Sequence, residues 1–246
     1  TDSSFATLDS LPLIRTAKWI ATIATTGYIP TKTKVDIGHV AEIIQVNEHE
    51  GVHIGFPLRT NASFSDKIAL EGNIGYGFKD KRLKGMARIS LDLPTPRKHQ
   101  IHMEYRDGYV WSEVDDFDRM LRENSMGKGD MDFTSYAFEA LHRDSLYINT
   151  AIRQQQLQFY WFADWTPNLE THTYIRAGWH HGLPHLSTQP IVHHSYAYQS
   201  FSFITRFSWQ ERKHDSFFMR RYTYSSRYPV LWVGLEAGHW AYTTPH

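Results

Sequence analysis

Residues 50–93, EGVHIGFPLRTNASFSDKIALEGNIGYGFKDKRLKGMARISLDL, decide the fold of this chain, because apolar and polar residues alternate along three consecutive segments separated by short turns. In the middle segment, Ile68 to Phe78, apolar residues occupy one set of alternating positions and small or polar residues occupy the other. Side chains of a β-strand point alternately to opposite faces. The pattern therefore predicts an up-and-down antiparallel meander with one apolar face and one polar face.

Two architectures fit this alternation: a soluble antiparallel sheet with one wet face, and a transmembrane β-barrel whose apolar face meets lipid. Strand length favours the barrel, because the segments run to about 10 residues or more against a usual length of about 5–6. The 8 Trp and 14 Tyr residues suit the aromatic girdles of a barrel, and they equally suit a sugar-stacking surface. No apolar run approaches the roughly 20 residues that a membrane-spanning helix needs.

The turns of this region resemble those of a Bacteroidota outer-membrane barrel family of unknown function, whose members carry an upstream carboxypeptidase-regulatory-like domain. The resemblance covers most of the chain and rests on the turn Asn47, Glu50 and Gly51, the strand end Arg59-Thr60-Asn61, the block Tyr76 to Lys81, and the segments 27–38 and 227–238. It implies a β-barrel in the outer membrane of a Gram-negative bacterium. It also implies that these residues are part of a longer barrel and that an upstream domain is missing.

We predict an all-β fold of about 10 long strands over residues 35–246, forming all or part of a transmembrane β-barrel. The first strand is expected at Val35–Val46 and the last two at Phe217–Tyr224 and Val230–Glu236. Residues 1–34 are predicted to hold a short helix, over 10–26, and a linker. Two long loops are expected near 109–144 and 181–195, and the first of them is predicted to bear a small helix.

The composition excludes several classes of function. Lys plus Arg equal Asp plus Glu at 26 each, so the charge does not indicate a nucleic-acid partner. Cysteine is absent, which excludes disulfides, zinc–thiolate sites and cysteine nucleophiles. No cofactor is expected.

Charged residues on the polar face form the first group of candidate site residues. Seven are predicted to face the lumen: Glu71, Lys84, Arg88, Asp92, Glu104, Arg106 and Arg206. They could line a selective pore, or they could form a salt-bridge ladder that fills a closed interior. The ladder is favoured, because opposite charges facing each other across neighbouring strands stabilise a sheet.

Histidines form the second group, since the segment WHHGLPHLSTQPIVHHS is rich in them. The weak candidates for a metal site are His180, His181, His185, His193 and His194. The segment has no Asp, Glu or Cys, and adjacent histidines on a strand point to opposite faces. Polar loop histidines without a metal are therefore the preferred interpretation.

No catalytic motif of the GxSxG, HExxH or phosphate-loop type occurs. His102 with Ser90 or Ser202 is the combination that a hydrolase could use. The sequence thus favours a non-enzymatic outer-membrane barrel, acting as a membrane-embedded platform or as a component of a surface assembly, with lipid and other outer-membrane or surface proteins as partners. The alternatives are a soluble secreted β-sandwich that binds glycans, with Trp161, Trp165, Trp179, Trp209 and Trp232 as candidate stacking residues, and an outer-membrane barrel hydrolase.

Overall fold

A computed structural model of the chain describes its strands and most of the connections between them. The described residues are 14, 16–17, 19–20, 22–23, 27–38, 40–47, 50–111, 151–181, 195–216, 219–223 and 228–242. The predicted N-terminal helix falls mostly outside them and is not shown. The small helix predicted within 109–144 and most of the predicted loop 181–195 also lie outside the described residues.

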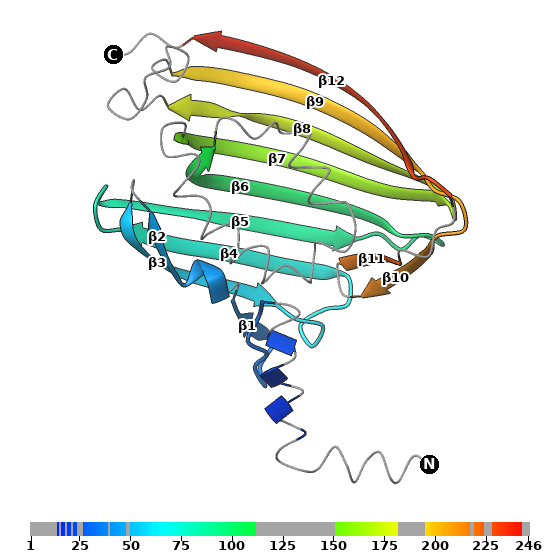
Figure 1. The fold of residues 1–246 in the computed structure, drawn as a ribbon, viewed down its shortest axis with the longest axis horizontal. Helices are drawn as coiled ribbons and strands as arrows, with labels where there is room; N and C mark the ends of the chain where they lie inside the picture. The colour runs from blue at the N-terminus through cyan, green and yellow to red at the C-terminus, as the bar shows by residue number, and fades with distance from the viewer. Residues whose placement is uncertain are drawn as a thin grey trace.

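In the described residues ten strands form one antiparallel sheet, which confirms the predicted all-β meander (Figure 1). From β3 to β9 each strand pairs with the next in sequence, and β12 pairs with β9. The strands are β1 (Val35–Ile37), β2 (Ile44–Asn47), β3 (Gly51–Thr60), β4 (Ile68–Gly77), β5 (Arg82–Asp92), β6 (His99–Trp111), β7 (Ala151–Thr166), β8 (Leu169–His181), β9 (Tyr196–Phe207) and β12 (Leu231–Tyr242).

Short polar turns keep consecutive strands adjacent. Between β3 and β4, the Asn61 side chain accepts the backbone N–H of Ser63 at 3.0 Å, and the Ser65 hydroxyl accepts that of Ile68 at 3.1 Å. Between β4 and β5, Lys81 has a positive φ of 53°, a conformation that tight turns require. Side-chain hydrogen bonds of this kind satisfy backbone groups that a turn takes out of the ladder.

The single first strand predicted at Val35–Val46 is wrong, because this segment is divided into β1 and β2 by a 3-10 helix, η1 (Val40–Glu42). The break begins at Gly38, whose φ of 141° is rare for residues with a side chain. Both short strands pair with the same side of β3, at its opposite ends. The irregular segment between them still accepts a backbone hydrogen bond from β3, since the N–H of Gly55 donates to the carbonyl of Ile43 at 2.9 Å.

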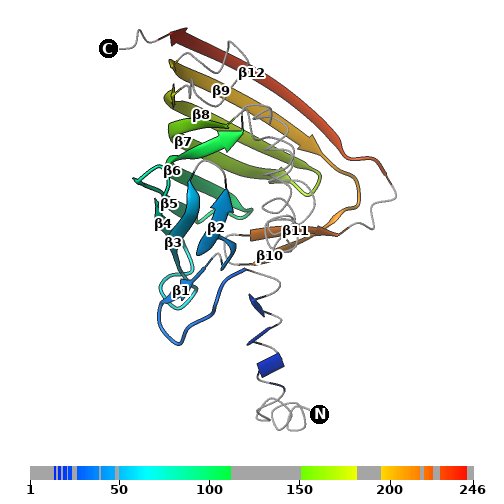
Figure 2. The same ribbon diagram turned by 60° about the vertical axis from the view of Figure 1, so that its left-hand side comes forward.

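The predicted strand at Phe217–Tyr224 is also wrong as a member of the main sheet. Instead, the connection from β9 to β12 contains β10 (Arg212–Ser216) and β11 (Met219–Thr223), which form a separate two-stranded sheet. This hairpin lies on the concave side of the curved main sheet (Figure 2). The final strand, predicted at Val230–Glu236, continues to Tyr242 and pairs with β9 along its whole length.

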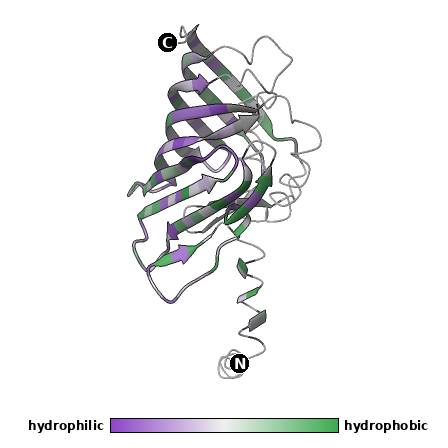
Figure 3. Ribbon diagram, turned by 90° about the vertical axis from the view of Figure 1, so that its left-hand side faces the viewer, coloured by the Kyte–Doolittle hydropathy of each residue, from purple (hydrophilic) through white to green (hydrophobic). Residues whose placement is uncertain are grey.

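Two faces of opposite character result from the alternation of residues along the strands (Figure 3). We call the concave face of the sheet the inner face. It is formed by the odd-numbered residues of β3 and β4 and by the even-numbered residues of β5–β9 and β12. The remaining residues of these strands form the outer face. The inner face buries polar side chains such as Glu104, Gln156 and Arg176. The outer face exposes large apolar side chains such as Phe56 and Met103. The sheet is thus apolar outside and polar inside.

The two edges of the sheet are not joined within the described residues. β12 forms one edge, and β1 and β2 lie at the other (Figure 1). No pairing between described residues links them, so closure into a barrel is not observed. No helix among the described residues is long and apolar enough to cross a bilayer.

We predict that Gly55→Ala destabilises the junction between β3 and η1. A Cβ atom at position 55 would lie 2.3 Å from the carbonyl oxygen of Glu42, a backbone atom that cannot move without shifting η1. Overpacking of this kind costs about 1–3 kcal/mol in the free energy of unfolding. Urea unfolding followed by tryptophan fluorescence measures it.

The matched control is Gly72→Ala, because the nearest atom to a Cβ there is the carbonyl oxygen of Met86 at an ordinary 3.6 Å. This variant should be neutral or slightly more stable, since alanine reduces the freedom of the unfolded chain. Equal effects of the two substitutions would contradict the close packing of η1 on β3.

Candidate functional site

Alternating charges cross the centre of the inner face in one row. The directly opposed residues of β4, β5 and β6 are Glu71, Arg88 and Glu104. The Arg88 guanidinium bonds both carboxylates, and it lies 3.3 Å from Glu71. Tyr28 extends the row by donating its hydroxyl to Glu71 at 2.8 Å, and Arg106 contacts Glu104 at 2.9 Å. These residues form the salt-bridge ladder of neighbouring strands.

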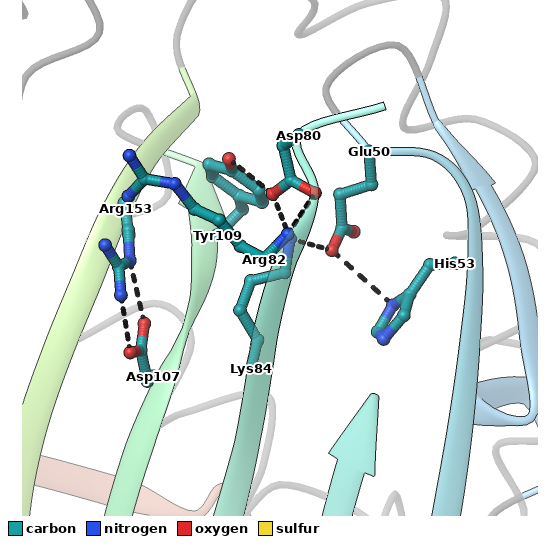
Figure 4. Close-up of polar contacts among 8 residues, drawn as sticks. All are labelled: Glu50, His53, Asp80, Arg82, Lys84, Asp107, Tyr109 and Arg153. Carbon is teal, nitrogen blue, oxygen red and sulfur yellow. Dashed lines mark hydrogen bonds and ion pairs between the residues drawn. The ribbon is translucent and has the colours of Figure 1, made fainter. Parts of the chain in front are cut away.

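Lys84 is the centre of a second cluster, near the turn between β4 and β5 (Figure 4). Its side chain is only 3% exposed, and its ammonium contacts the carboxylates of Glu50 and Asp80. The Tyr109 hydroxyl donates to Asp80 at 2.9 Å, and the Tyr109 ring centroid lies 4.5 Å from the Lys84 nitrogen. His53 Nδ1 lies 3.6 Å from Glu50. One buried cation therefore joins the β2–β3 turn to the β4–β5 turn.

Two glycines of β4 make room for this cluster. A Cβ atom at Gly75 would lie 1.9 Å from Nε2 of His53, and one at Gly77 would lie 2.2 Å from Oδ1 of Asp80 and 3.1 Å from the Lys84 nitrogen. Any larger residue would push these charged or polar side chains away. Gly75 and Gly77 are thus needed for the close packing of the side chains in the Lys84 cluster.

A third cluster lies at the opposite end of the strands and holds the β10–β11 hairpin. Glu170, with no exposed surface, contacts Arg206 at 3.3 Å and Lys213 of β10 at 2.7 Å. Lys213 also lies 3.6 Å from Asp164, and Arg206 pairs with Glu211 at 2.6 Å. These ion pairs hold the start of β10 against the inner face.

A polar group on the outer face marks the end of its apolar surface. Arg153 makes two hydrogen bonds to the Asp107 carboxylate, at 2.9 and 2.7 Å. Gln155 donates to Asp107 at 3.0 Å, and its carbonyl oxygen lies 3.1 Å from His181 Nε2. We call these four residues the polar rim. They lie at the same end of the strands as the Lys84 cluster.

The structure separates the two described histidines of the predicted metal group. His180, on the inner face, contacts the Tyr196 hydroxyl, whereas His181 belongs to the polar rim on the outer face. Among the described residues, no group of three His, Cys, Asp or Glu side chains is arranged to hold a metal ion. His185, His193 and His194 lie outside the described residues.

The structure brings Ser90 and His102 together but leaves Ser202 apart. Ser90 Oγ lies 2.7 Å from His102 Nδ1, and the two residues are directly opposed on β5 and β6. Ser202 lies on β9, with β7 and β8 between it and His102. No carboxylate in the described part of the chain bonds the imidazole, which stacks on Tyr160 with centroids 5.1 Å apart. The pair has the geometry of a cross-strand hydrogen bond and lacks the acid of a triad.

The tryptophans considered for sugar stacking do not share one surface. Trp161, Trp165 and Trp179 are at outer positions, Trp209 follows β9, and Trp232 is on the inner face. Trp165 and Trp161 pack edge to face with centroids 6.1 Å apart. This arrangement resembles an aromatic border at a strand end more than a sugar platform.

All seven charges predicted for the polar face occupy inner positions, and the pairing of six of them is described above, Asp92 being the exception. Sequence reasoning missed several of their partners. Asp80 lies in a turn and Lys213 in the off-sheet hairpin, where a period of two gives no signal. Glu170 could have been found, because it continues the alternation of inner positions toward the start of β8, two residues before His172.

No protein-family model, curated protein or solved structure matches the chain, so the site is interpreted from its own geometry. Chemically, the inner face presents paired charges in three clusters. Buried ions need such partners, because leaving water costs each of them several kcal/mol. The arrangement stabilises a polar interior and fixes which residues oppose each other.

We predict that Lys84→Met lowers the free energy of unfolding by about 3–5 kcal/mol, because it leaves two carboxylates without their cation. Adding Glu50→Gln and Asp80→Asn to the same chain should restore part of the loss. The measurement is urea unfolding. Lys67→Met is the control, since Lys67 is exposed in the β3–β4 turn and its loss should change stability by less than about 0.5 kcal/mol. Equal losses for the two lysines would contradict the cluster.

Asp80 makes the stability of this cluster depend on pH. Burial opposes ionisation, but hydrogen bonds from Lys84 and Tyr109 outweigh it and hold the pKa of the Asp80 carboxyl below its usual value. A group with a depressed folded pKa stabilises the fold above its unfolded pKa of about 3.9, and this contribution is lost as pH falls through the folded pKa. Asp80→Asn should therefore destabilise the protein at pH 7 and make little difference well below pH 4. A difference that stays constant down to low pH would contradict this role.

Proposed function

We propose that the chain forms the wall of a transmembrane β-barrel in the outer membrane of a Gram-negative bacterium, and that it serves as a non-enzymatic platform or a component of a surface assembly. One observation carries the proposal: burial is inverted relative to a water-soluble sheet. Met103 and Ile175 on the outer face are 52% and 51% exposed, whereas Glu170 and Arg206 on the inner face are 0% and 3% exposed.

The outer face has the composition that a lipid environment requires. Its positions from Val52 to Leu58, Ile68 to Tyr76, Leu83 to Leu91 and Ile101 to Tyr105 contain no Asp, Glu, Lys or Arg. A contiguous apolar surface across this many strands would associate or aggregate in water. In hydrocarbon the same surface is stable, because charged side chains there are costly and apolar ones are not.

The height of the apolar surface supports the same environment. Along β7 it extends from Gln155 of the polar rim to Trp165, a distance of roughly 33 Å at about 3.3 Å per residue. Strands of outer-membrane barrels tilt by about 35–45°, which reduces that length to about 25 Å along the membrane normal. This equals the usual apolar band of such barrels, and Trp165 lies at the end of the band, where an aromatic girdle is expected.

The paired charges favour a structural wall over a selective pore. Arg88, Lys84 and Arg206 each contact two carboxylates, so their charge is compensated within the wall. A selectivity lining needs charges that act on a passing ion. The soluble, glycan-binding sandwich has less support, because a second layer would have to cover the outer face and the described residues supply none.

We predict that Ile175→Arg destabilises the protein in a bilayer by about 2–4 kcal/mol, because the substitution places a charge near the middle of the lipid-facing surface. His181→Arg, on the same strand and face but within the polar rim, should cost only about 0–1 kcal/mol. Urea unfolding from lipid vesicles measures both, with heat-modifiable electrophoretic mobility as the test of folding.

A soluble sheet gives the opposite result, since arginine in place of an exposed isoleucine is tolerated in water. Equal stability of the two variants, or a folded monomer that is soluble without detergent, would overturn the barrel proposal.

A further inference from the structure

Within the part of the chain that the structure describes, the main sheet contains an odd number of strand positions. The path from β1 through β3–β9 to β12 has nine members, and β2 shares the position of β1 because both pair with the same side of β3. Every pairing along the path is antiparallel. The direction therefore reverses eight times along the path, and β12 runs in the same direction as β1 and β2.

Closing the sheet on itself would require a parallel pairing at the seam. Bacterial single-chain barrels are antiparallel throughout and have even strand numbers. The lengths also disagree: β12 has 12 residues, while β1 and β2 have 3 and 4 and are separated by η1. Most of the β12 backbone would remain unpaired after such a closure. In hydrocarbon each unpaired N–H or C=O costs several kcal/mol.

A second copy of the chain does not solve this problem. Antiparallel pairing of β12 with β12 of another copy needs a twofold axis across the strands, which turns the second copy upside down in the membrane. The polar rim and the Trp165 end of that copy would then exchange leaflets. Pairing of β12 with β1 and β2 of another copy would again be parallel. Both arrangements conflict with a directional antiparallel wall.

The side chains of β12 are exposed at its free edge and alternate in the way that a neighbouring strand would require. Leu235 is 74% exposed at an outer position and Trp240 is 60% exposed at an inner one, although β9 covers the other edge of the strand. The outer positions Leu231 to Ala237 continue the apolar surface, and the inner position Glu236 lies 3.8 Å from Arg176 on β8. The in–out alternation of the wall thus extends to the last described strand.

We propose that β12 is the docking edge for one further kind of element: a transmembrane β-strand from outside these 246 residues that runs antiparallel to β12. This strand is apolar at its outward positions and small or polar at its inward ones, with a hydrogen-bond donor opposite Glu236. The inference rests on the proposed membrane function. It deepens that function by naming what the open edge binds.

The test places the photo-crosslinking residue p-benzoylphenylalanine at Leu235 in the protein embedded in its native outer membrane. The expected product is a peptide from outside residues 1–246, identified by mass spectrometry, whose sequence alternates apolar and polar residues over about 9–11 positions. A probe placed on that strand should in turn crosslink to β12. The matched control is the same residue at Leu157, which is 51% exposed on the outer face but has paired strands on both sides. It should crosslink lipid only.

Three outcomes overturn the proposal: a crosslink from Leu235 to residues 35–47 of the same chain, a crosslink to a second copy, or a lipid adduct without any peptide. Carbonate extraction of the same membranes distinguishes this failure from failure of the barrel itself. A chain that stays in the membrane with only lipid at Leu235 refutes the docking edge alone. A chain released without detergent refutes the membrane function.

Discussion

Pairing of buried charges across neighbouring strands is the interaction on which the inner face depends. Arg88 joins three strands through Glu71 and Glu104, and Lys84 joins the β2–β3 turn to the β4–β5 turn through Glu50 and Asp80. Breaking such a contact leaves an uncompensated charge, so these pairs strongly favour one register. A slip of one residue would move Arg88 to the outer face and Ile89 to the inner face, because side chains alternate along a strand. The charges therefore specify strand order and register together.

The same alternation explains why the outer face can be apolar over most of its area. In a soluble sheet, stability comes from covering that face with a second layer. In the described part of this chain the buried apolar core is small, centred on Tyr174 and Ile204 with Tyr160 and Trp232 against it. In the barrel that we propose, lipid takes the place of this second layer, so the outer side chains need little packing against protein. The polar rim and the tryptophans then set where the apolar surface ends.

The sequence allowed the meander and its two faces to be predicted because both follow from a period of two, which is local. The inner positions of β4 and β5, including Glu71 and Arg88, were identified in this way. Departures from that period could not be predicted. The break at Gly38 depends on how η1 packs against Gly55, and the hairpin of β10 and β11 depends on contacts between Lys213 and Glu170, which are distant in sequence. Asp80 was missed because alternation along a strand does not assign a turn residue to either face of the sheet. Its position becomes clear only once β4 and β5 are paired.

The pairing of charges on the inner face differs between the interior strands of the sheet and its open edge at β12. Lys84, Arg88 and Arg206 of the inner face find their carboxylate partners away from β12, and each of these cations lies on a strand with a neighbour on both sides. On β12 the inner positions hold no cation; they are Trp232, Gly234, Glu236, Gly238, Trp240 and Tyr242. Glu236 reaches back to Arg176 at 3.8 Å but remains about 38% exposed. The carboxylate of Glu236 thus lies farther from its cation than those paired with Lys84, Arg88 and Arg206, and it lies on the edge strand where we propose that another antiparallel strand binds.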